Sequence, residues 1–400
     1  MTIETSQLAL HGGPKAKATP YGTGQRFGDA ERRLLDEALS QNTLFCFSGK
    51  MVKRLENEFA EMIGAKYAVA STSGTASIHV ALGALGIGPG DEVITTPITD
   101  QGTVVGPLFQ GAKVLFADLE PYTYQPDPNS VAALITPRTR AIVVVQLAGA
   151  TANMDRLREI AQRTGVPLVE DCAQSFLAEY DGRYAGTMGA LGCFSLNDHK
   201  HISVGDGGLT VTDDLDLARA ARRFTDKWYQ REKDLNREVD RLAPNYRMSE
   251  LCGAVGVAQL GKLRWICSRR RELGNRLTSL IEGLPGIHPH QIVPKGKSSY
   301  WFYMLRVDES VIGCDRNTFA QALRAEGLSA GAGYIEKPVY LTELFTRMGR
   351  PYVPGLCPVA EEILTTAIRL PINEFHTDQD IEETGVAIRK VALYYAGQKR

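Results

Sequence analysis

The chain has 400 residues, of which 44% are hydrophobic and 23% charged, and its formal net charge is −1. This composition is typical of a soluble globular protein large enough for two domains. A net charge so near zero provides no field that favours nucleic acid or an anionic membrane, so we expect small molecules or other proteins as partners.

The N-terminal segment and the cysteines indicate a cytoplasmic protein. The segment has no basic stretch followed by an apolar core, so it does not read as a signal peptide. No apolar run approaches the roughly 18–20 residues of a membrane span. The seven cysteines form no C-x-x-C pair, so we expect reduced thiols and no metal site.

The first two-thirds of the chain alternate between helical and strand patterns. Apolar residues recur at helical spacing in residues 30–41, 53–65 and 153–165, and the glycine-rich exit "GIGPGDE" follows a helix, which excludes a dinucleotide-binding turn. Short apolar runs that end in polar residues occupy 66–72, 92–97, 112–119, 140–149 and 166–173. This alternation predicts a mostly parallel sheet with helices on both faces.

The pattern changes after a long helical stretch from Ser249 to about Leu284. Residues 298–308 alternate like an antiparallel strand, and 315–327 and 378–395 have the spacing of amphipathic helices. We therefore predict a large α/β domain over residues 1–280, including an N-terminal arm, and a smaller α+β domain over 281–400.

Three short segments carry residues that suggest chemistry. In "STSGTAS" the first turn of a predicted helix contains Gly74 and Thr75, where free N–H groups suit a phosphate, although ordinary capping by Ser73 explains the pattern equally well. Asp171 follows a buried strand, where it serves a ligand or simply caps a helix or forms an ion pair. Lys200 stands between two histidines, ahead of glycines 205, 207 and 208.

Taken alone, Lys200 is best interpreted as a lysine of a surface loop. A metal site formed by His199, Lys200 and His201 is a weaker interpretation, because lysine is not a usual metal ligand. Together, however, an anion site, a strand-end carboxylate and a lysine meet the needs of pyridoxal phosphate. The phosphate needs N–H donors, the pyridine nitrogen needs a carboxylate, and the aldehyde needs an amine. A lysine with a lowered pKa is a nucleophile toward carbonyls.

At the level of motifs, the chain resembles the DegT/DnrJ/EryC1/StrS sugar aminotransferases from about Gly24 to Tyr395. The family's D-x-A-Q corresponds to residues 171–174, its S-F-x-x-x-K to 195–200, its G-E-G-G to 205–208, its S-G-T-x-A to "SGTAS", and its N-x-R-M to 245–248. The resemblance implies a fold-type I pyridoxal phosphate enzyme with a seven-stranded, mostly parallel sheet. It also implies a homodimer with shared active sites.

The same resemblance implies roles for individual residues. Lys200 would bond to the cofactor and move the proton, and Asp171 would bind the pyridine N–H. The implied cofactor-binding set is Gly74, Thr75, Gln101, Asp171, Ala173, Gln174, Ser195, Lys200 and Asn245, with Asn245 reaching the neighbouring subunit's phosphate. We also predict substrate contacts for His199, His201, Tyr334 and Phe47, with packing as the alternative for both histidines.

Several positions depart from the family pattern. Gln101, beside Asp100, stands where many members stack an aromatic ring on the cofactor. Gln146 stands in "VVVQLAG", which lacks the usual His or Tyr, and Asp206 replaces a glutamate. These changes put the substrate in doubt more than the cofactor. Residues 222–233 contain basic and aromatic side chains that could contact a nucleotide, or they form a solvated helix face.

We therefore predict an aminotransferase that moves an amino group from L-glutamate or L-glutamine to a keto sugar or keto cyclitol. The opening "LALHGGPKA" resembles inosose aminotransferases, which leaves cyclitol and nucleotide sugar both open. Two alternatives remain: a dehydratase or oxidase on a related sugar, and a non-catalytic regulatory protein that binds pyridoxal phosphate.

Overall fold

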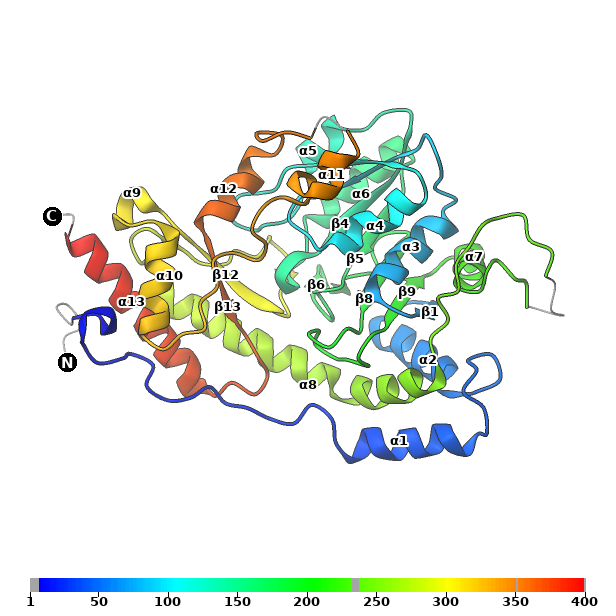
Figure 1. The fold of residues 1–400 in the computed structure, drawn as a ribbon, viewed down its shortest axis with the longest axis horizontal. Helices are drawn as coiled ribbons and strands as arrows, with labels where there is room; N and C mark the ends of the chain where they lie inside the picture. Colours follow the sequence, from blue (N-terminus) through cyan, green and yellow to red (C-terminus); the bar gives the residue numbers. More distant parts are fainter. Residues whose placement is uncertain (1–6, 232–236, 350–351, 399–400) are drawn as a thin grey trace.

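The structure is a computed structural model that describes residues 7–231, 237–349 and 352–398 (Figure 1). A seven-stranded sheet forms its centre, with the strand order β1-β9-β8-β5-β4-β2-β3. Only β9 runs antiparallel to its neighbours. The strands are β1 (Tyr67–Ser71), β2 (Glu92–Thr95), β3 (Lys113–Phe116), β4 (Thr139–Val145), β5 (Leu168–Asp171), β8 (Leu191–Ser195) and β9 (Gly208–Thr212).

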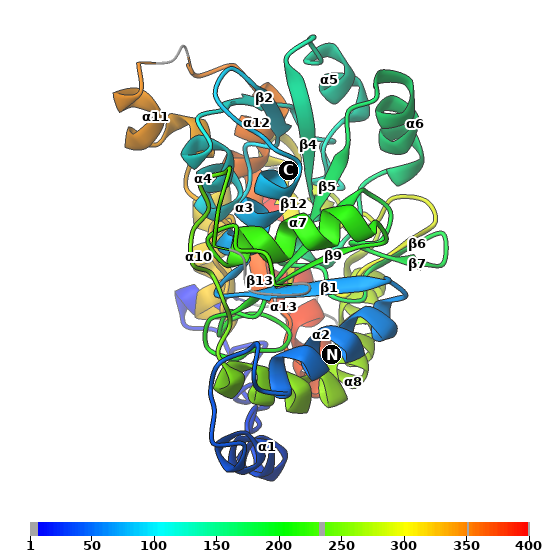
Figure 2. The same ribbon diagram turned by 90° about the vertical axis from the view of Figure 1, so that its right-hand side faces the viewer.

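Helices cover both faces of this sheet because its strands are apolar on both sides. Along β4, Ala141 and Val143 pack toward α3, whereas Ile142 and Val144 pack toward α6. Figure 2 shows β1 between α7 on one side and α2 and α8 on the other. The helices of this part are α1 (Asp29–Ser40), α2 (Met51–Ile63), α3 (Gly74–Ala84), α4 (Gln101–Phe109), α5 (Pro128–Ala133), α6 (Met154–Thr164), α7 (Leu215–Thr225) and α8 (Glu250–Ile281).

The C-terminal part contains a three-stranded antiparallel sheet in the order β10-β12-β13, formed by Ile287–His288, Phe302–Val307 and Ala367–Pro371. A second small sheet joins β6 (Glu179–Tyr180), β7 (Arg183–Tyr184) and β11 (Gly296–Lys297). The remaining helices are α9 (Glu309–Ile312), α10 (Arg316–Ala325), α11 (Glu343–Arg347), α12 (Pro358–Thr366), α13 (Asp378–Gln398), and the 3-10 turns η2 (Ala9–His11), η3 (Leu147–Gly149) and η4 (Val339–Leu341).

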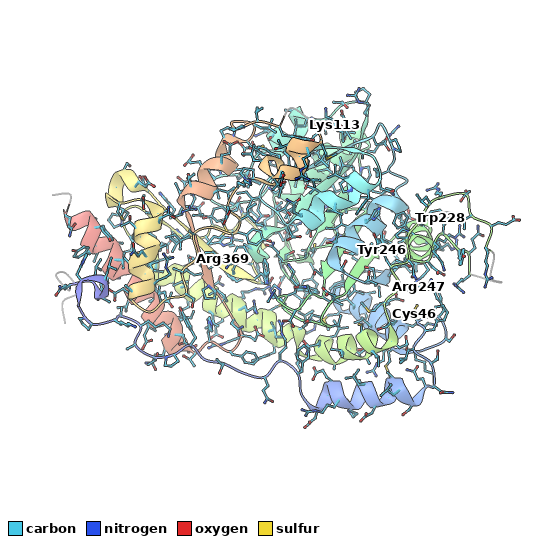
Figure 3. All side chains as sticks on the ribbon, viewed as in Figure 1. Cys46, Lys113, Trp228, Tyr246, Arg247 and Arg369 are labelled. Carbon is cyan, nitrogen blue, oxygen red and sulfur yellow. The ribbon has the colours of Figure 1, made fainter. Side chains whose placement is uncertain are left out.

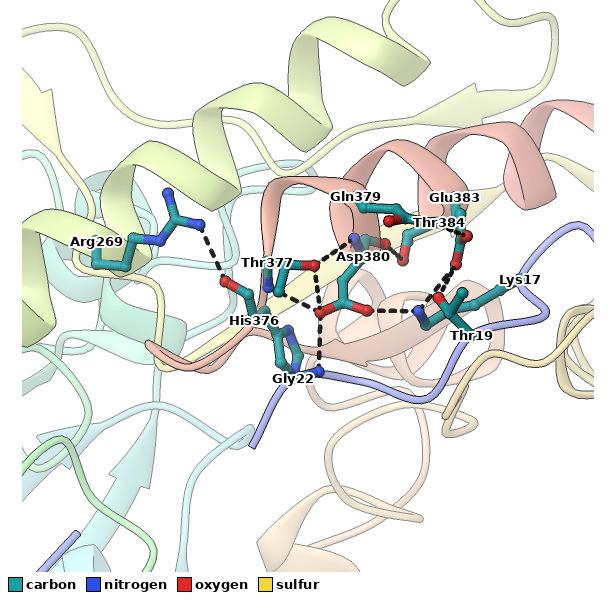
Figure 4. A network of polar contacts seen from close by, with 10 residues as sticks. All are labelled: Lys17, Thr19, Gly22, Arg269, His376, Thr377, Gln379, Asp380, Glu383 and Thr384. Atoms are coloured by element: carbon teal, nitrogen blue, oxygen red, sulfur yellow. Dashed lines mark hydrogen bonds and ion pairs between the residues drawn. The ribbon is translucent and has the colours of Figure 1, made fainter. Parts of the chain in front are cut away.

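The long helix α8 belongs to two hydrophobic cores. Its first half packs with α1 and α2 beneath the large sheet, and its second half packs with α10, α13 and β12. The N-terminal segment also spans the molecule, because it lies against α13 at one end and leads into α1 at the other (Figure 1). A buried ion pair between Lys17 and Asp380 (2.6 Å) holds this segment to α13 (Figure 4).

The predicted fold class is confirmed: the chain is an α/β protein with a seven-stranded, mostly parallel sheet and a smaller C-terminal α+β part. The domain boundary at residue 280 stays a prediction. All seven cysteines are free thiols. Across the described part of the chain, no helix combines the length and the apolar character that crossing a bilayer requires.

Candidate active site

Most of the predicted site residues lie at one edge of the large sheet, either where its strands end or at the helix starts that follow them. The parallel strands β2, β4, β5 and β8 end at this edge, and β5 ends at Asp171 and β8 at Ser195. Ligands in open α/β sheets bind outside the carboxyl ends of the strands. The loops after these strands therefore meet where a ligand is expected.

Two helix N-termini and one serine lie close together in a corner of the site, here called the anion corner. A Cβ on Gly74 would lie 2.5 Å from the Cβ of Ser195, so glycine is required for this close approach. A Cβ on Gly102 would lie 2.6 Å from Oγ1 of Thr75, which places the start of α4 beside the start of α3. The N–H groups of a helix's first turn have no partner within the helix. At the start of α4 the Gly102 N–H already donates to the Asp100 carboxylate (2.8 Å), so the start of α3 and the Ser195 hydroxyl are the groups that suit a phosphate.

Asp171 is a buried carboxylate at the centre of the site. Its Oδ2 accepts a hydrogen bond from the Thr103 hydroxyl (2.7 Å) and its Oδ1 accepts one from the Ala173 N–H (3.1 Å). Burial raises its pKa, and these two hydrogen bonds act in the opposite direction. A carboxylate has about four lone-pair sites, so it can accept a further donor such as a pyridinium N–H.

Lys200 lies in the turn after β8, and its amine faces an aromatic ring. Its Nζ is 3.9 Å from the ring centroid of Trp301. Burial lowers the pKa of Lys200, whereas the charges of Asp171 and Asp100 raise it. The Trp301 indole N–H donates to the His199 carbonyl oxygen (2.7 Å), which fixes the ring against the lysine turn. The amine is thus sheltered from water and near a carboxylate.

Gln174 and Tyr334 connect the sheet edge to the C-terminal part. The Gln174 Nε2 donates to the Tyr334 hydroxyl (3.0 Å), and its Oε1 accepts from the Ala148 N–H (2.8 Å). The Tyr334 ring lies 5.9 Å from Trp301 and 5.2 Å from Phe302, measured between centroids. Burial raises the pKa of Tyr334, so its hydroxyl stays protonated. The predicted Tyr334 therefore lies in an aromatic wall beside Lys200.

Gln101 begins α4, directly after its capping residue Asp100. Its Nε2 is 3.4 Å from the Thr342 hydroxyl, and its Oε1 is buried with no hydrogen-bond partner. Buried acceptors in native proteins are nearly always satisfied, so this oxygen has capacity for a donor from a bound molecule. Aromatic side chains at this edge come instead from Trp301, Phe302 and Tyr334.

The structure separates the two histidines that flank the lysine. His201 is fully buried, and its Nε2 lies 3.2 Å from the Ser299 carbonyl oxygen. A substrate contact would require this ring to leave the core, so its surroundings support the packing alternative. His199 is exposed and lines a cavity with Trp301 and Arg369.

Gln146 is not an altered cofactor contact. Its Nε2 donates to Glu170 (2.9 Å), and its Oε1 accepts from the Ala152 N–H (2.7 Å). Glu170 also accepts the N–H groups of Gly186, Met188 and Gly189. This buried network holds the loop before β8, and it leaves no polar atom of the Gln146 amide free for a ligand.

Phe47 and Asn245 lie in a separate surface cluster, away from Lys200 in the same chain. The Phe47 ring contacts Arg231 (4.6 Å from guanidinium to centroid), and Asn245 is exposed and pairs with Asp226 in an isolated bridge. In Figure 3 the neighbours Tyr246 and Arg247 are labelled to the right of Arg369, near Trp228 and Cys46.

The segment 222–233 is only partly helical, so the prediction of a solvated helix face is wrong for most of it. Helix α7 ends at Thr225, and Lys227 and Trp228 have positive φ. Trp228 is buried. Glu232 and Lys233 lie outside the described residues.

Sequence reasoning missed Thr103 and Arg369 as site residues, and it left Trp301 open, because the segment that contains it is consistent with both a cleft lining and a core. Thr103 follows Gln101 by two residues, so its place in the first turn of α4 was the available signal. Trp301 lies in "SSYWFYML", which can be read equally well as core. The 298–301 loop reaches the site because Ser299 and Trp301 donate backbone hydrogen bonds to Gly149 (2.8 Å) and Ala148 (3.2 Å).

The residues present fit pyridoxal phosphate. The anion corner suits its phosphate, Asp171 can accept its ring N–H, Lys200 supplies the amine, and the unpaired Gln101 oxygen faces no protein donor. Among the residues that the structure describes, no group of three or more His, Cys, Asp or Glu could hold a metal ion.

Comparison with known proteins agrees with this geometry. The sequence model of the DegT/DnrJ/EryC1/StrS aminotransferase family matches residues 26–389. The chain is 32% identical to the spore coat polysaccharide biosynthesis protein SpsC of Bacillus subtilis, over 86% of this chain and 90% of that protein.

It is also 33% identical to a putative L-glutamine:3-amino-2,3-dideoxy-scyllo-inosose aminotransferase of Streptoalloteichus tenebrarius, over 86% of this chain and 83% of that protein. The crystal structure of 3-amino-5-hydroxybenzoic acid synthase superposes with a TM-score of 0.86 and 28% identity, covering 96% of this chain and 100% of that one. The chain belongs to the DegT/DnrJ/EryC1/StrS aminotransferase family of fold-type I, pyridoxal phosphate-dependent enzymes.

Proposed function

We propose that this protein transfers the amino group of L-glutamine or L-glutamate to a keto cyclitol or keto sugar. The amino acid loses its amino group and becomes a 2-oxo acid, and the ketone gains it and becomes an amine. The observation that carries the proposal is the placement of a half-buried lysine amine, a buried carboxylate and an anion corner at one sheet edge. The inosose relative supports glutamine as donor and a cyclitol as acceptor.

Each residue has a defined task in this proposal. The start of α3, with Gly74 and Thr75, and the Ser195 hydroxyl would hold the phosphate. Asp171, held by Thr103, would keep the pyridine nitrogen protonated. When bound, pyridoxal phosphate supplies an electron-withdrawing ring that stabilises negative charge at the carbon that loses its proton.

Lys200 would take that proton and return it. Its lowered pKa makes the neutral amine, which is the form that accepts a proton, more accessible near neutral pH. The rings of Trp301 and Tyr334 restrict water around the amine, and backbone hydrogen bonds to Ala148 and Gly149 hold in place the loop that carries Trp301.

We further propose a homodimer in the cytoplasm, with a boundary between domains near residue 280. Asn245 is exposed in the single chain and lies apart from the anion corner, which agrees with a role in a neighbouring subunit's site.

Dehydration or amine oxidation is the second candidate. Gln101 and Asp100 support it, because no aromatic ring occupies the position where relatives stack one. Gln146 no longer supports it, since its amide is fully engaged with Glu170 and Ala152. Lys200 favours transfer of an amino group. A purely regulatory role would not require a buried, reactive amine beside Asp171.

The absorption spectrum of the purified holoenzyme tests the proposal. We expect a yellow band that fades on addition of L-glutamine or L-glutamate, with release of the matching 2-oxo acid. Lys200→Ala should abolish the fading, whereas Lys113→Ala should not, because Lys113 is half-exposed on β3 and 3.8 Å from Glu92 (Figure 3). Turnover of a ketone without consumption of a donor would favour the second candidate.

A further inference from the structure

The backbone of the turn that carries Lys200 is bonded by side chains from distant parts of the chain. Among the described residues, no backbone N–H donates to the carbonyl oxygens of residues 198–201. Arg26, in the N-terminal segment, donates instead to three of them: its Nη1 bonds that of residue 198, and its Nη2 bonds those of residues 200 and 201. The carbonyl oxygen of residue 199 accepts from the Trp301 indole (2.7 Å). Two side chains thus hold all four carbonyls of the turn.

Helix α8 holds Arg26 in place. The Arg26 carbonyl oxygen accepts from Gln259 Nε2 (3.0 Å) and from Lys262 Nζ (2.9 Å), and both of these donors also bond Glu31 in the first turn of α1. Gln259 is fully buried, and its Oε1 accepts from the Ser203 N–H (3.3 Å), just after the lysine turn. The N-terminal segment and the lysine turn are therefore bonded to the same buried side chain.

The side chain of Arg26 bonds the lysine turn and nothing else in the described part of the chain. It is half-buried, and its guanidinium donates to backbone carbonyls of this turn rather than to a carboxylate. A guanidinium presents five donors in a fixed plane, so it can bond several acceptors at once, whereas an ammonium is a compact point charge. The N-terminal segment has a separate attachment, since Lys17 pairs with Asp380 on α13. The contacts of Arg26 therefore suit control of the turn.

We propose that Arg26 is a positioning residue that fixes the backbone of Lys200 and thereby places its amine for proton transfer; the assignment rests on the proposed aminotransferase function. The amine stands at the end of a flexible four-carbon stem, so its position depends on where the backbone of the turn is held. Asp171 and the anion corner lie on other elements and have no contact with Arg26. Loss of the guanidinium would therefore displace the amine and leave the cofactor's other contacts intact. A displacement of about 1 Å can slow a reaction by roughly a hundredfold.

The test compares Arg26→Gln, Arg26→Lys and Arg32→Gln holoenzymes with the wild type. Arg32 is the matched control, because it is exposed on α1 and its ion pair is with Asp29. Hydrogen exchange of peptides covering residues 196–204 measures how firmly the turn is held. The pH at which the yellow band changes, recorded without any amino acid, reports the surroundings of the lysine nitrogen. Titration with the active donor gives the maximal rate of fading and the donor concentration at half that rate.

We expect Arg26→Gln to speed hydrogen exchange in the turn and to lower the maximal rate of fading by roughly ten- to a hundredfold. The donor concentration at half-maximal rate should stay as in the wild type. The pH at which the band changes should rise, because burial lowers the pKa of Lys200 and water that enters a loosened turn opposes this effect. Arg26→Lys should restore part of the rate, since an ammonium can still donate to some of the carbonyls, and Arg32→Gln should match the wild type.

A folded Arg26→Gln protein with the wild-type band and the wild-type rate of fading would overturn the assignment, even if exchange in the turn were faster, because the contacts would then serve stability alone. A raised donor concentration at half-maximal rate, with the maximal rate unchanged, would also overturn it and would point to donor binding. A wild-type holoenzyme that no amino acid bleaches would contradict the proposed function itself. The exchange and band measurements need no donor, so they would still test whether Arg26 holds the lysine.

Discussion

At the residue scale, Gly74 shows that the anion corner depends on a missing side chain. Alanine is normally better than glycine inside a helix by about 1 kcal/mol. At Gly74 the added Cβ would stand 2.5 Å from the Ser195 Cβ, a distance that real atoms do not adopt. The serine or the start of α3 must therefore move, and both belong to the proposed phosphate site.

We expect Gly74→Ala to weaken pyridoxal phosphate binding at least tenfold, because a displaced N–H or hydroxyl removes a charged hydrogen bond worth about 1.5–3 kcal/mol. Equilibrium dialysis of the cofactor measures this. Gly261→Ala on α8 is the matched control, since nothing lies within 4 Å of its added Cβ. It should raise stability slightly and leave cofactor binding unchanged. Equal cofactor affinity in both variants would contradict the assigned role of Gly74.

The residues that sequence could identify are those within short motifs. Lys200, Asp171 and Gly74 occur in spacings that a family resemblance carries. Arg369 could not be predicted, and Trp301 could not be told from a core residue, because both reach this edge only through the packing of β12 and β13, more than 100 residues after Lys200. Gln146 was misread for a related reason: its partner Glu170 precedes Asp171 by one residue but points the other way, into a structural network.

At the element scale, the buried carboxylate of Asp380 holds the N-terminal segment to α13, together with Lys390, whose Nζ donates to the Pro14 carbonyl oxygen (2.7 Å). Asp380 accepts hydrogen bonds from Lys17 Nζ (2.6 Å), the Gly22 N–H (2.9 Å) and both donors of Thr377 (2.8 and 2.9 Å) (Figure 4). These donors lower the pKa of Asp380 far below its usual value, so it stays ionised. Lys17 also bonds Glu383 at 3.2 Å.

We expect Asp380→Asn to lower the free energy of unfolding by about 3 kcal/mol, because it leaves the buried Lys17 ammonium partly uncompensated. Urea denaturation measures the loss, and limited proteolysis should show faster cleavage before α1. Arg347→Gln, which breaks an exposed ion pair with Glu343, should change stability by no more than about 0.5 kcal/mol. An Asp380→Asn protein as stable and as protected as the wild type would refute the fastening role.

The observed helices and strands agree with the predicted ones where the hydrophobic periodicity extends over a long stretch of neighbouring residues. Strands β1, β2, β3 and β5 and helices α6, α8 and α10 lie within the predicted ranges, and β4, α1, α2 and α13 extend beyond theirs by one to three residues. The exceptions have a physical cause. The segment after α7 is set by tertiary contacts of Trp228, which override its helical composition. Strands β6, β7 and β11 have two residues each, which is too short for a hydrophobic pattern to predict them.

At the scale of the whole molecule, buried neutral histidines link stability to pH. His290 has no hydrogen-bond partner for either ring nitrogen and packs against Tyr124, Tyr300 and Tyr303. Burial lowers its pKa to about 4, and burial also lowers that of His376 to about 4. In the unfolded chain both regain values near 6.5.

The native state holds both rings neutral, whereas the unfolded chain binds a proton at each ring below about pH 6.5. The free energy of unfolding is therefore unaffected above pH 6.5 and decreases as the pH falls toward 4, by up to about 3 kcal/mol for each ring. We expect His290→Phe, which keeps an aromatic ring in place, to flatten the stability profile between pH 6.5 and 4 relative to the wild type. Urea denaturation at several pH values measures the difference. Parallel profiles for the two proteins would show that His290 does not contribute.

The helix α8 has a mechanical consequence. Its 32 residues span about 48 Å as one continuous rod. Two consecutive arginines near its middle form ion pairs with different halves of the molecule. Arg270 pairs with Glu374 of the C-terminal part, and Arg271 pairs with Glu179 beside the large sheet. Any rotation of the C-terminal part relative to the large sheet must therefore bend or twist α8. The separation of the two halves at the active-site edge is therefore set by the stiffness of α8.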